Sequence, residues 1–149
     1  MKPLSKANTA ILTAIQEGDI NKLIQASPYA KLLGVEAIVL GDEMLFHLPA
    51  NDDNIGNPML PAIHGGVIGG FMEVAAQLTV MHRVETPFVP KVVDLSLDYL
   101  RPGKNVASYA QCVLVRQGRK VVNVSITAWQ DTQDKPIATA RTHFLLSEG

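Results

Sequence analysis

The sequence predicts an α+β protein with one antiparallel sheet. Apolar residues at helical spacing occur in the first 34 residues and in one long apolar segment, Val67–Met81. After residue 90 apolar and polar residues alternate, which is typical of strands. Because a helix that is apolar nearly all round must be covered on most sides, we expect the sheet to wrap around this one long central helix.

Three short helical patterns precede the first strand. Apolar residues at helical spacing mark residues 7–17, and Asp19 is a suitable N-cap for a second short helix. A third helical turn begins at Ser27-Pro28 and ends near Gly34. The sequence therefore predicts extra short N-terminal helices, with residues 1–26 forming an N-terminal helical extension.

Strand patterns begin directly after Gly34. Val35–Leu40 and Met44–Leu48 flank Gly41-Asp42-Glu43, which is a hairpin signal. In Lys91–Leu100 the side chains at 93, 95, 97 and 99 are expected on one face and those at 94, 96 and 98 on the other. The other predicted strands are Val106–Arg116, Lys120–Gln130 and Ile137–Leu146, joined by turns at 117–119 and 131–135.

The composition argues against several classes of function. A chain of 149 residues predicts one domain, 1–149, with a sizeable core. A net charge of −1 argues against nucleic acid as the main partner. One cysteine, Cys112, excludes an intrachain disulfide and a Cys-based metal site. The longest uncharged stretch, Asn54–Met72, is interrupted by prolines and glycines, so we expect no membrane span and a cytoplasmic protein.

The most informative motif is a loop that leads into the long apolar helix. Residues 57–66 read Asn-Pro-Met-Leu-Pro-Ala-Ile-His-Gly-Gly, and the helical segment that follows carries a single carboxylate, Glu73. Burying a lone carboxylate is costly unless it is paired or used in chemistry. Glu73 is therefore either a catalytic group or a structural acid bonded to the backbone or to Gln77, one turn further on.

The order of elements and five motifs resemble the hotdog fold, and within it the acyl-CoA thioesterases of the phenylacetate-degradation (PaaI-like) type. The resemblance covers roughly residues 27–146. It implies a homodimer or a dimer-of-dimers tetramer that hydrolyses a small or medium acyl-CoA, aliphatic or aromatic, with no metal or other cofactor. The motifs are Ser27-Pro28-Tyr29, Leu33-Gly34-Val35, His64-Gly65-Gly66, Glu73 and the segment Asp94–Pro102.

The resemblance also implies the main catalytic roles. Glu73 would attack the thioester carbonyl or activate a water, and the amide of Gly65, with Gly66 beside it, would stabilise the oxyanion. Eight residues of helix separate Gly65 from Glu73, or about 12 Å at 1.5 Å per residue. One helix therefore cannot bring both groups to the same carbonyl, so we expect them to come from different subunits.

Several further residues are candidates for positioning or substrate contact. In the family His64 belongs to the active-site loop, and Asn57 would orient the thioester or water. The family's asparagine more typically stands six residues before the histidine, whereas Asn57 stands seven before it, and Asn54 is a rival. Val92 replaces the Ser or Thr that many relatives use to position water, and Gln77 is a possible substitute. Gly66, Gly69, Gly70, Glu73 and Gln77 share one helix face, where the glycines favour either a slot for the substrate or close approach of a partner helix.

Two other interpretations remain open from the sequence. Arg119, with Arg116 and Lys120, marks either a site for the phosphates of coenzyme A or a solvated hairpin tip. The whole protein is either a thioesterase or a non-catalytic acyl-CoA-binding protein. A hotdog dehydratase is a further alternative, but its His-Phe-Pro context is absent.

Overall fold

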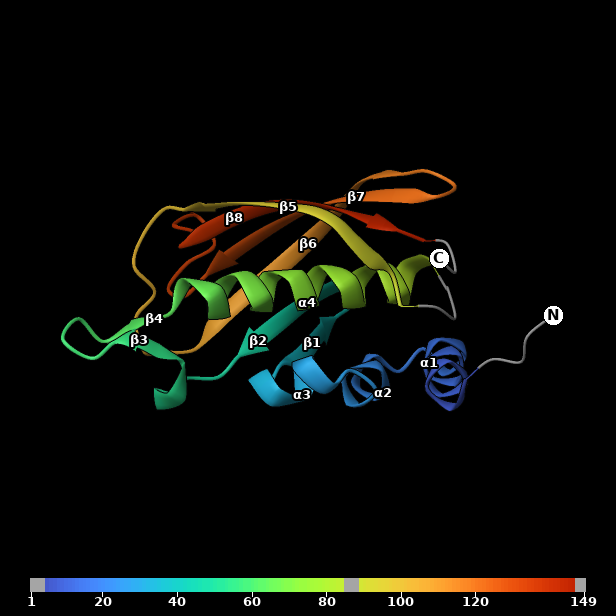
Figure 1. Cartoon of the computed structure of the whole chain (residues 1–149), viewed down its shortest axis with the longest axis horizontal. Coiled ribbons are helices and arrows are strands. Elements are labelled where there is room, and N and C mark those ends of the chain that lie inside the picture. Colours follow the sequence, from blue (N-terminus) through green and yellow to red (C-terminus); the bar gives the residue numbers. More distant parts are fainter. Residues whose placement is uncertain (1–4, 85–88, 147–149) are drawn as a thin grey trace.

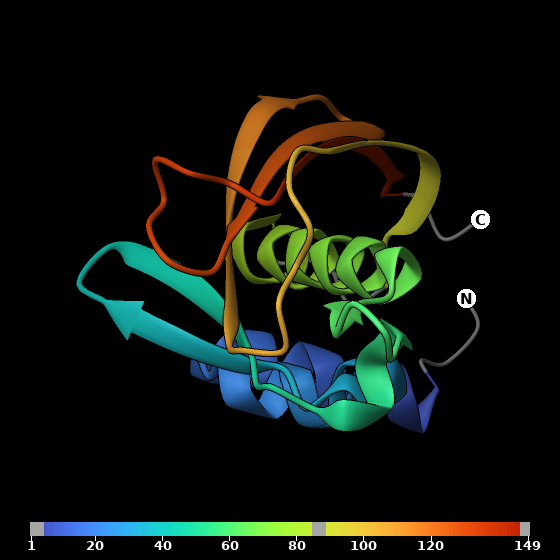
Figure 2. The same cartoon turned by 90° about the vertical axis from the view of Figure 1, so that its left-hand side faces the viewer.

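The computed structural model describes residues 5–84 and 89–146. Figure 1 shows a six-stranded antiparallel sheet that lies over one long helix, α4 (Gly65–Val84), with three short helices below. Figure 2, turned by 90°, shows α4 obliquely and the sheet curling around it. The predicted fold class is confirmed, including the wrapping of the sheet around the central helix.

The three short helices are α1 (Lys6–Glu17), α2 (Ile20–Gln25) and α3 (Pro28–Leu33). Their predicted boundaries follow from local caps. The Asp19 carboxylate accepts hydrogen bonds from two backbone N–H groups at the start of α2, and the Ser27 hydroxyl accepts one from Ala30. Gly34 ends α3 with φ of 76°, a left-handed conformation that favours glycine.

The large sheet has the strand order β1-β2-β6-β7-β8-β5, with every neighbouring pair antiparallel. A separate two-stranded ribbon, β3–β4, precedes α4 and was not predicted, because its strands are only three and two residues long. The bounds are β1 (Glu36–Leu40), β2 (Glu43–Leu48), β3 (Ile55–Asn57), β4 (Ala62–Ile63), β5 (Lys91–Tyr99), β6 (Ser108–Gln117), β7 (Val121–Trp129) and β8 (Ala138–Leu145).

The predicted alternation along β5 is only partly correct. A register shift between Val92 and Asp94 interrupts the pairing with β8, so Val93 departs from the pattern and is 62% exposed. Leu95 and Leu97 are half-buried against the core, as expected. As an edge strand, β5 pairs with β8 on one side only.

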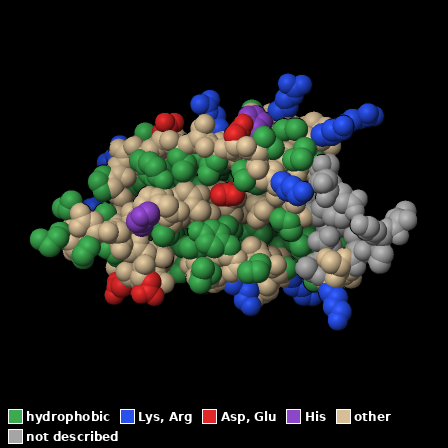
Figure 3. Space-filling view, viewed as in Figure 1, with side chains coloured by type: hydrophobic (Ala, Val, Ile, Leu, Met, Phe, Trp, Pro, Cys, Tyr) green, Lys and Arg blue, Asp and Glu red, His purple; other side chains and the backbone are tan. Residues whose placement is uncertain are grey.

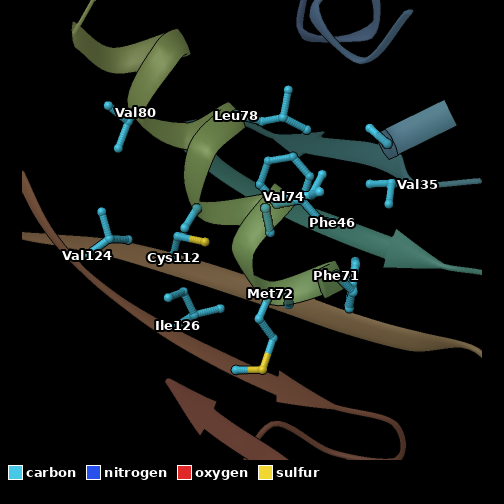
Figure 4. Packing of buried hydrophobic residues seen from close by; sticks show 14 of the residues in the cluster. Val35, Phe46, Phe71, Met72, Val74, Leu78, Val80, Cys112, Val124 and Ile126 are labelled. Atoms are coloured by element: carbon cyan, nitrogen blue, oxygen red, sulfur yellow. The ribbon is translucent and has the colours of Figure 1, made fainter. Parts of the chain in front are cut away.

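The core fills the space between α4 and the concave face of the sheet. Figure 4 shows α4 side chains such as Met72 and Val74 among residues of β2, β6 and β7. Phe46, Met72 and Ile126 are fully buried. At about 25 cal/mol per Å² of buried apolar surface, this contact supplies the main force that fixes α4 under the sheet.

Candidate functional site

The start of α4 is built around His64. Its imidazole Nδ1 accepts a hydrogen bond from the N–H of Gly66 (2.9 Å), and its carbonyl accepts from Val67 and Ile68. His64 therefore acts as the N-cap of α4. The N–H of Gly65, by contrast, has no acceptor among the described residues. The positive end of the helix thus presents one free amide, that of Gly65, while the amide of Gly66 is already satisfied.

Tyr99 holds the same turn from the side. Its hydroxyl donates a hydrogen bond to the carbonyl of Gly65 (2.7 Å), and a Cβ added to Gly65 would lie 3.3 Å from the tyrosine ring. Sequence reasoning assigned Tyr99 to a strand face and gave it no place in the site. The sequence feature that could have pointed to Tyr99 is its place within the Asp94–Pro102 motif. Its contact with Gly65 joins residues 34 positions apart, so only the folded structure reveals it.

A shallow depression lies beside the free amide. Its walls come from the end of β4, the first turn of α4 and the chain that follows β5. It is lined by Ala62, Ile63, Gly65, Ile68 and residues 99–103. The depression opens to solvent, so a small ligand can approach Gly65 there.

Glu73 lies two turns further along α4. The rest of α4 is largely buried, but Glu73 is half-exposed and has no hydrogen-bond or ion-pair partner in the part of the chain that the structure describes. The interpretation of Glu73 as a structural acid bonded to Gln77 is therefore wrong for the described residues. In Figure 3 an acidic group lies over α4 with hydrophobic side chains on both sides.

Gly69 and Gly70 serve packing within the chain itself. A Cβ on Gly69 would lie 2.8 Å from Leu97 Cδ1, and one on Gly70 would collide with the Tyr29 hydroxyl. Tyr29 of α3 and Leu97 of β5 thus pack against α4 about one turn before Glu73. Neither the substrate slot nor the partner helix is needed to explain Gly69 and Gly70, whereas Gly66 is exposed. A contact between Gly70 and substrate stays a prediction.

Gln77 and Val92 mark the other end of this face. The Gln77 side-chain amide donates to the carbonyl of Pro90 (3.1 Å), which ties α4 to the chain entering β5. Val92, just beyond, is 42% exposed. Two contacts fix how β5 crosses α4: Leu97 lies against Gly69, and the carbonyl of Pro90 accepts a hydrogen bond from Gln77. Val92 lies between Pro90 and Leu97 in the sequence, which places it alongside the stretch from Glu73 to Gln77.

The two candidate asparagines have different structural tasks. The Asn57 side chain accepts the N–H of Met59 (3.0 Å) and shapes the turn between β3 and β4. The Asn54 carbonyl accepts the N–H of His64 (2.8 Å) and so braces the loop that leads into α4. Neither side chain reaches Glu73 of the same chain by a hydrogen bond among the described residues.

The basic cluster lies at the opposite end of the molecule. Arg116, Arg119 and Lys120 line a surface hollow at the turn between β6 and β7, together with Asn123 and His143. In Figure 1 this turn is at the right, whereas α4 begins at the left. Within one chain, therefore, Arg119 is not brought to the Gly65 amide.

Cys112 is not a candidate nucleophile. Its thiol is buried beneath α4, and burial raises its pKa to about 12. Since the thiolate is the reactive form, a raised pKa makes the thiol inert near neutral pH. Residues 5–84 and 89–146 contain no group of three or more His, Cys, Asp or Glu side chains able to hold a metal ion.

Comparison with known proteins agrees with this geometry. The family model of the thioesterase superfamily matches residues 60–137, which contain His64, Gly65 and Glu73. The chain belongs to the thioesterase superfamily. It is accordingly a thioester hydrolase, and the expected resemblance to hotdog thioesterases is confirmed.

Individual relatives show the extent of the likeness. A solved protein from Chromobacterium violaceum is 41% identical, with a TM-score of 0.76 over 94% of this chain and 98% of that one. The medium/long-chain acyl-CoA thioesterase YigI of Salmonella typhimurium is 28% identical over 84% of this chain and 91% of its own length. The PaaI protein of E. coli, at 19% identity and a TM-score of 0.70 over 95% of this chain and 99% of its own, shares the fold.

Two remaining findings concern coenzyme A and the membrane. A Bacillus halodurans protein crystallised with CoA shares the fold, at 20% identity and a TM-score of 0.73 over 99% of this chain and 98% of its own. None of the described helices is long and apolar enough to cross a membrane.

Proposed function

We propose that the protein is an acyl-CoA thioesterase whose active site is completed by two subunits. The observation that carries this proposal is that the Gly65 amide and the Glu73 carboxylate, eight residues apart on one helix, both lack a partner among the described residues. At about 1.5 Å per residue they are roughly 12 Å apart along the axis, too far to act on one carbonyl. A second copy that runs antiparallel would bring each Gly65 to the partner's Glu73, and two equivalent sites would result.

The proposed reaction uses water and no other reactant. The Gly65 N–H donates to the thioester oxygen as it gains negative charge. Glu73 of the other subunit takes a proton from a water, whose oxygen adds to the carbonyl carbon; the C–S bond then breaks and the thiolate of coenzyme A takes up the proton. In the alternative route, the Glu73 carboxylate adds to the carbonyl carbon, the C–S bond breaks and the thiolate of coenzyme A leaves; water then hydrolyses the resulting anhydride, which frees Glu73 and supplies the thiol proton.

The other site residues have supporting roles in this proposal. His64 and Tyr99 fix the first turn of α4, so that the Gly65 amide keeps its direction. Asn57 shapes the loop in front of it. Gln77 and Val92 border the site from the subunit that supplies Glu73. Gly66 and Gly70 lie where the pantetheine arm of coenzyme A would pass. Arg119 contacts phosphate only if a further subunit brings its hairpin to the site, as in a dimer-of-dimers tetramer.

The substrate is proposed to be an aliphatic acyl-CoA. The distant relative YigI is named for medium- and long-chain acyl-CoA. Apart from Arg101, the depression beside Gly65 is lined by uncharged and mostly apolar residues, which favours an aliphatic acyl group. An aromatic acyl group is the competing choice.

The test is a thiol-release assay across acetyl-, butyryl-, decanoyl-, palmitoyl- and phenylacetyl-CoA. We expect turnover that Glu73→Gln abolishes while the fold and ligand binding persist, because the amide keeps the shape of the side chain and loses its basicity. Saturable binding of acyl-CoA without thiol release would instead make this an acyl-CoA-binding protein. A Glu73→Gln variant as active as the wild type would remove Glu73 from the mechanism.

A further inference from the structure

A rigid apolar projection stands directly in front of the active-site loop. The apolar tip, defined as Pro58, Met59, Leu60 and Pro61, joins β3 to β4 and lies at the far left of Figure 1. The Met59 side chain is 87% exposed and that of Leu60 71%. Contiguous exposed apolar side chains on a soluble protein usually mark an interaction site.

The apolar tip is held in place by its neighbours. Asn57 accepts hydrogen bonds from the N–H groups of Met59 (3.0 Å) and Leu60 (3.2 Å). The base of the ribbon is anchored by the N–H of Ile63, which donates to the carbonyl of Gly103 (2.8 Å). Prolines at both ends of the tip restrict it further. Little conformational entropy is therefore lost when the tip binds a partner.

The two-subunit active site determines where the apolar tip must go. If each Gly65 faces the partner's Glu73, the two α4 helices are antiparallel and the two-fold axis passes near Gly69. In Figure 1 the β3–β4 ribbon continues beyond the start of α4, roughly along the helix axis. Leu60 stands five residues before Gly65, up to about 16 Å at 3.3 Å per extended residue. That reach corresponds to about 11 residues of helix beyond the partner's Glu73, as far as Val84.

An exposed apolar surface is present at that place. The apolar ledge, defined as Val89, Val92 and Val93, lies where the chain enters β5 and is 44%, 42% and 62% exposed. The Gln77–Pro90 hydrogen bond fixes this ledge against the second half of α4. In this antiparallel arrangement the apolar tip of one subunit therefore reaches the same level along the partner's α4 as the partner's apolar ledge.

We propose that the apolar tip of one subunit and the apolar ledge of its partner form the two walls of the acyl-chain subsite. Met59, Leu60 and Val92 then determine how well a long aliphatic chain is accepted. This inference rests on the proposed function, since it needs the two-subunit site. In this proposal Val92 contacts the acyl chain through its two methyl groups, whereas a Ser at this position would place a polar hydroxyl there.

A membrane surface is a less suitable partner for the apolar tip. Asp52 and Asp53, both exposed, stand just before the ribbon that carries the tip, and an anionic leaflet would repel them. The ribbon from Ile55 to Ile63 itself carries no Lys or Arg, and Lys104 reaches only its base, where it pairs with Ala62. The tip is instead continuous with the end of α4 that the partner must approach.

The experiment compares kcat/KM for butyryl-, octanoyl- and dodecanoyl-CoA in the wild type and in the double variant Met59→Ser/Leu60→Ser. One methylene contact contributes a factor of about four in binding. With two apolar side chains truncated, kcat/KM for dodecanoyl-CoA should fall at least tenfold more than that for butyryl-CoA. Val113→Ser is the matched control: Val113 is 60% exposed but lies on the sheet face opposite the buried Cys112, and its chain-length profile should equal that of the wild type.

A second variant keeps the test independent of the stability of the tip. Val92→Phe narrows the subsite from the partner's side and should likewise shift preference toward short chains. The proposal is contradicted if, in both variants, kcat/KM falls equally for all chain lengths or does not change. It is also contradicted if the wild type binds phosphatidylcholine vesicles and the double variant does not. Failure of the proposed function is distinguishable, because the wild type itself would then show no Glu73-dependent thiol release.

Discussion

The imidazole of His64 is the acceptor for the Gly66 N–H, so His64→Ala removes the side-chain cap of α4. The first turn of the helix then has an N–H with only water as partner. Loss of an N-cap acceptor costs typically about 1 kcal/mol in the free energy of unfolding. For a chain of this size, that corresponds to a fall in Tm of about 2–4 °C. The loss is confined to the cap, because the imidazole is exposed and contributes little to the core.

The same change should lower kcat, because the free Gly65 amide belongs to the turn that loses its cap. Complete removal of one oxyanion donor costs about 10²–10³ in kcat, so a loosened donor should cost less than that. His64→Asn is the matched variant, since asparagine is a favourable N-cap residue. It should recover most of the lost Tm and part of kcat. The reasoning is refuted if His64→Ala melts with the wild type, or if asparagine restores nothing.

Three further predictions concern the same framework. Tyr99→Phe removes the hydroxyl that donates to the carbonyl of Gly65. Because Tyr99 is half-exposed, the free energy of urea unfolding should fall by an amount near the lower end of about 0.5–1.5 kcal/mol. The kcat of this variant should fall more than that of the Val113→Ser control. Phe46→Ala empties a fully buried position and should cost about 3–5 kcal/mol in urea unfolding, with a loss under 1 kcal/mol contradicting the packing account. The Cys112 thiol, with a pKa raised to about 12, should react with dithionitrobenzoate at pH 8 only after unfolding, and rapid native labelling would show that it is accessible.

The parts of the fold that sequence predicted are those with local causes. The N-caps Asp19 and Ser27, the positive-φ Gly34 and the apolar segment of α4 each act within a few residues, and the structure confirms the elements they define. The β3–β4 ribbon was missed because two or three residues carry no period. The register shift in β5 depends on its pairing with β8, which alternation within one strand does not reveal.

The candidate site shows the same difference between features with local causes and contacts that depend on the fold. His64, Gly65 and Glu73 were identified from spacing and from the family resemblance, and the structure adds that the Gly66 amide is already bonded to His64. Tyr29, Leu97 and Tyr99 could not be found in the same way, because they approach α4 from α3 and β5. The prediction that Gly65 and Glu73 act from different subunits came from helix length alone. It stays a prediction, because the structure contains one chain.

The most direct test of the two-subunit site is complementation between two inactive variants. Gly65→Pro removes the free N–H at the first helical position, where proline is well tolerated, and Gly65→Ala keeps the N–H as its control. Gly65→Pro and Glu73→Gln should each be inactive alone. After the two proteins are mixed and their subunits exchanged, half of the dimers contain one intact site of two, so about a quarter of wild-type activity should return. If the mixture stays inactive although mixed dimers have formed, Gly65 and Glu73 do not act across the interface.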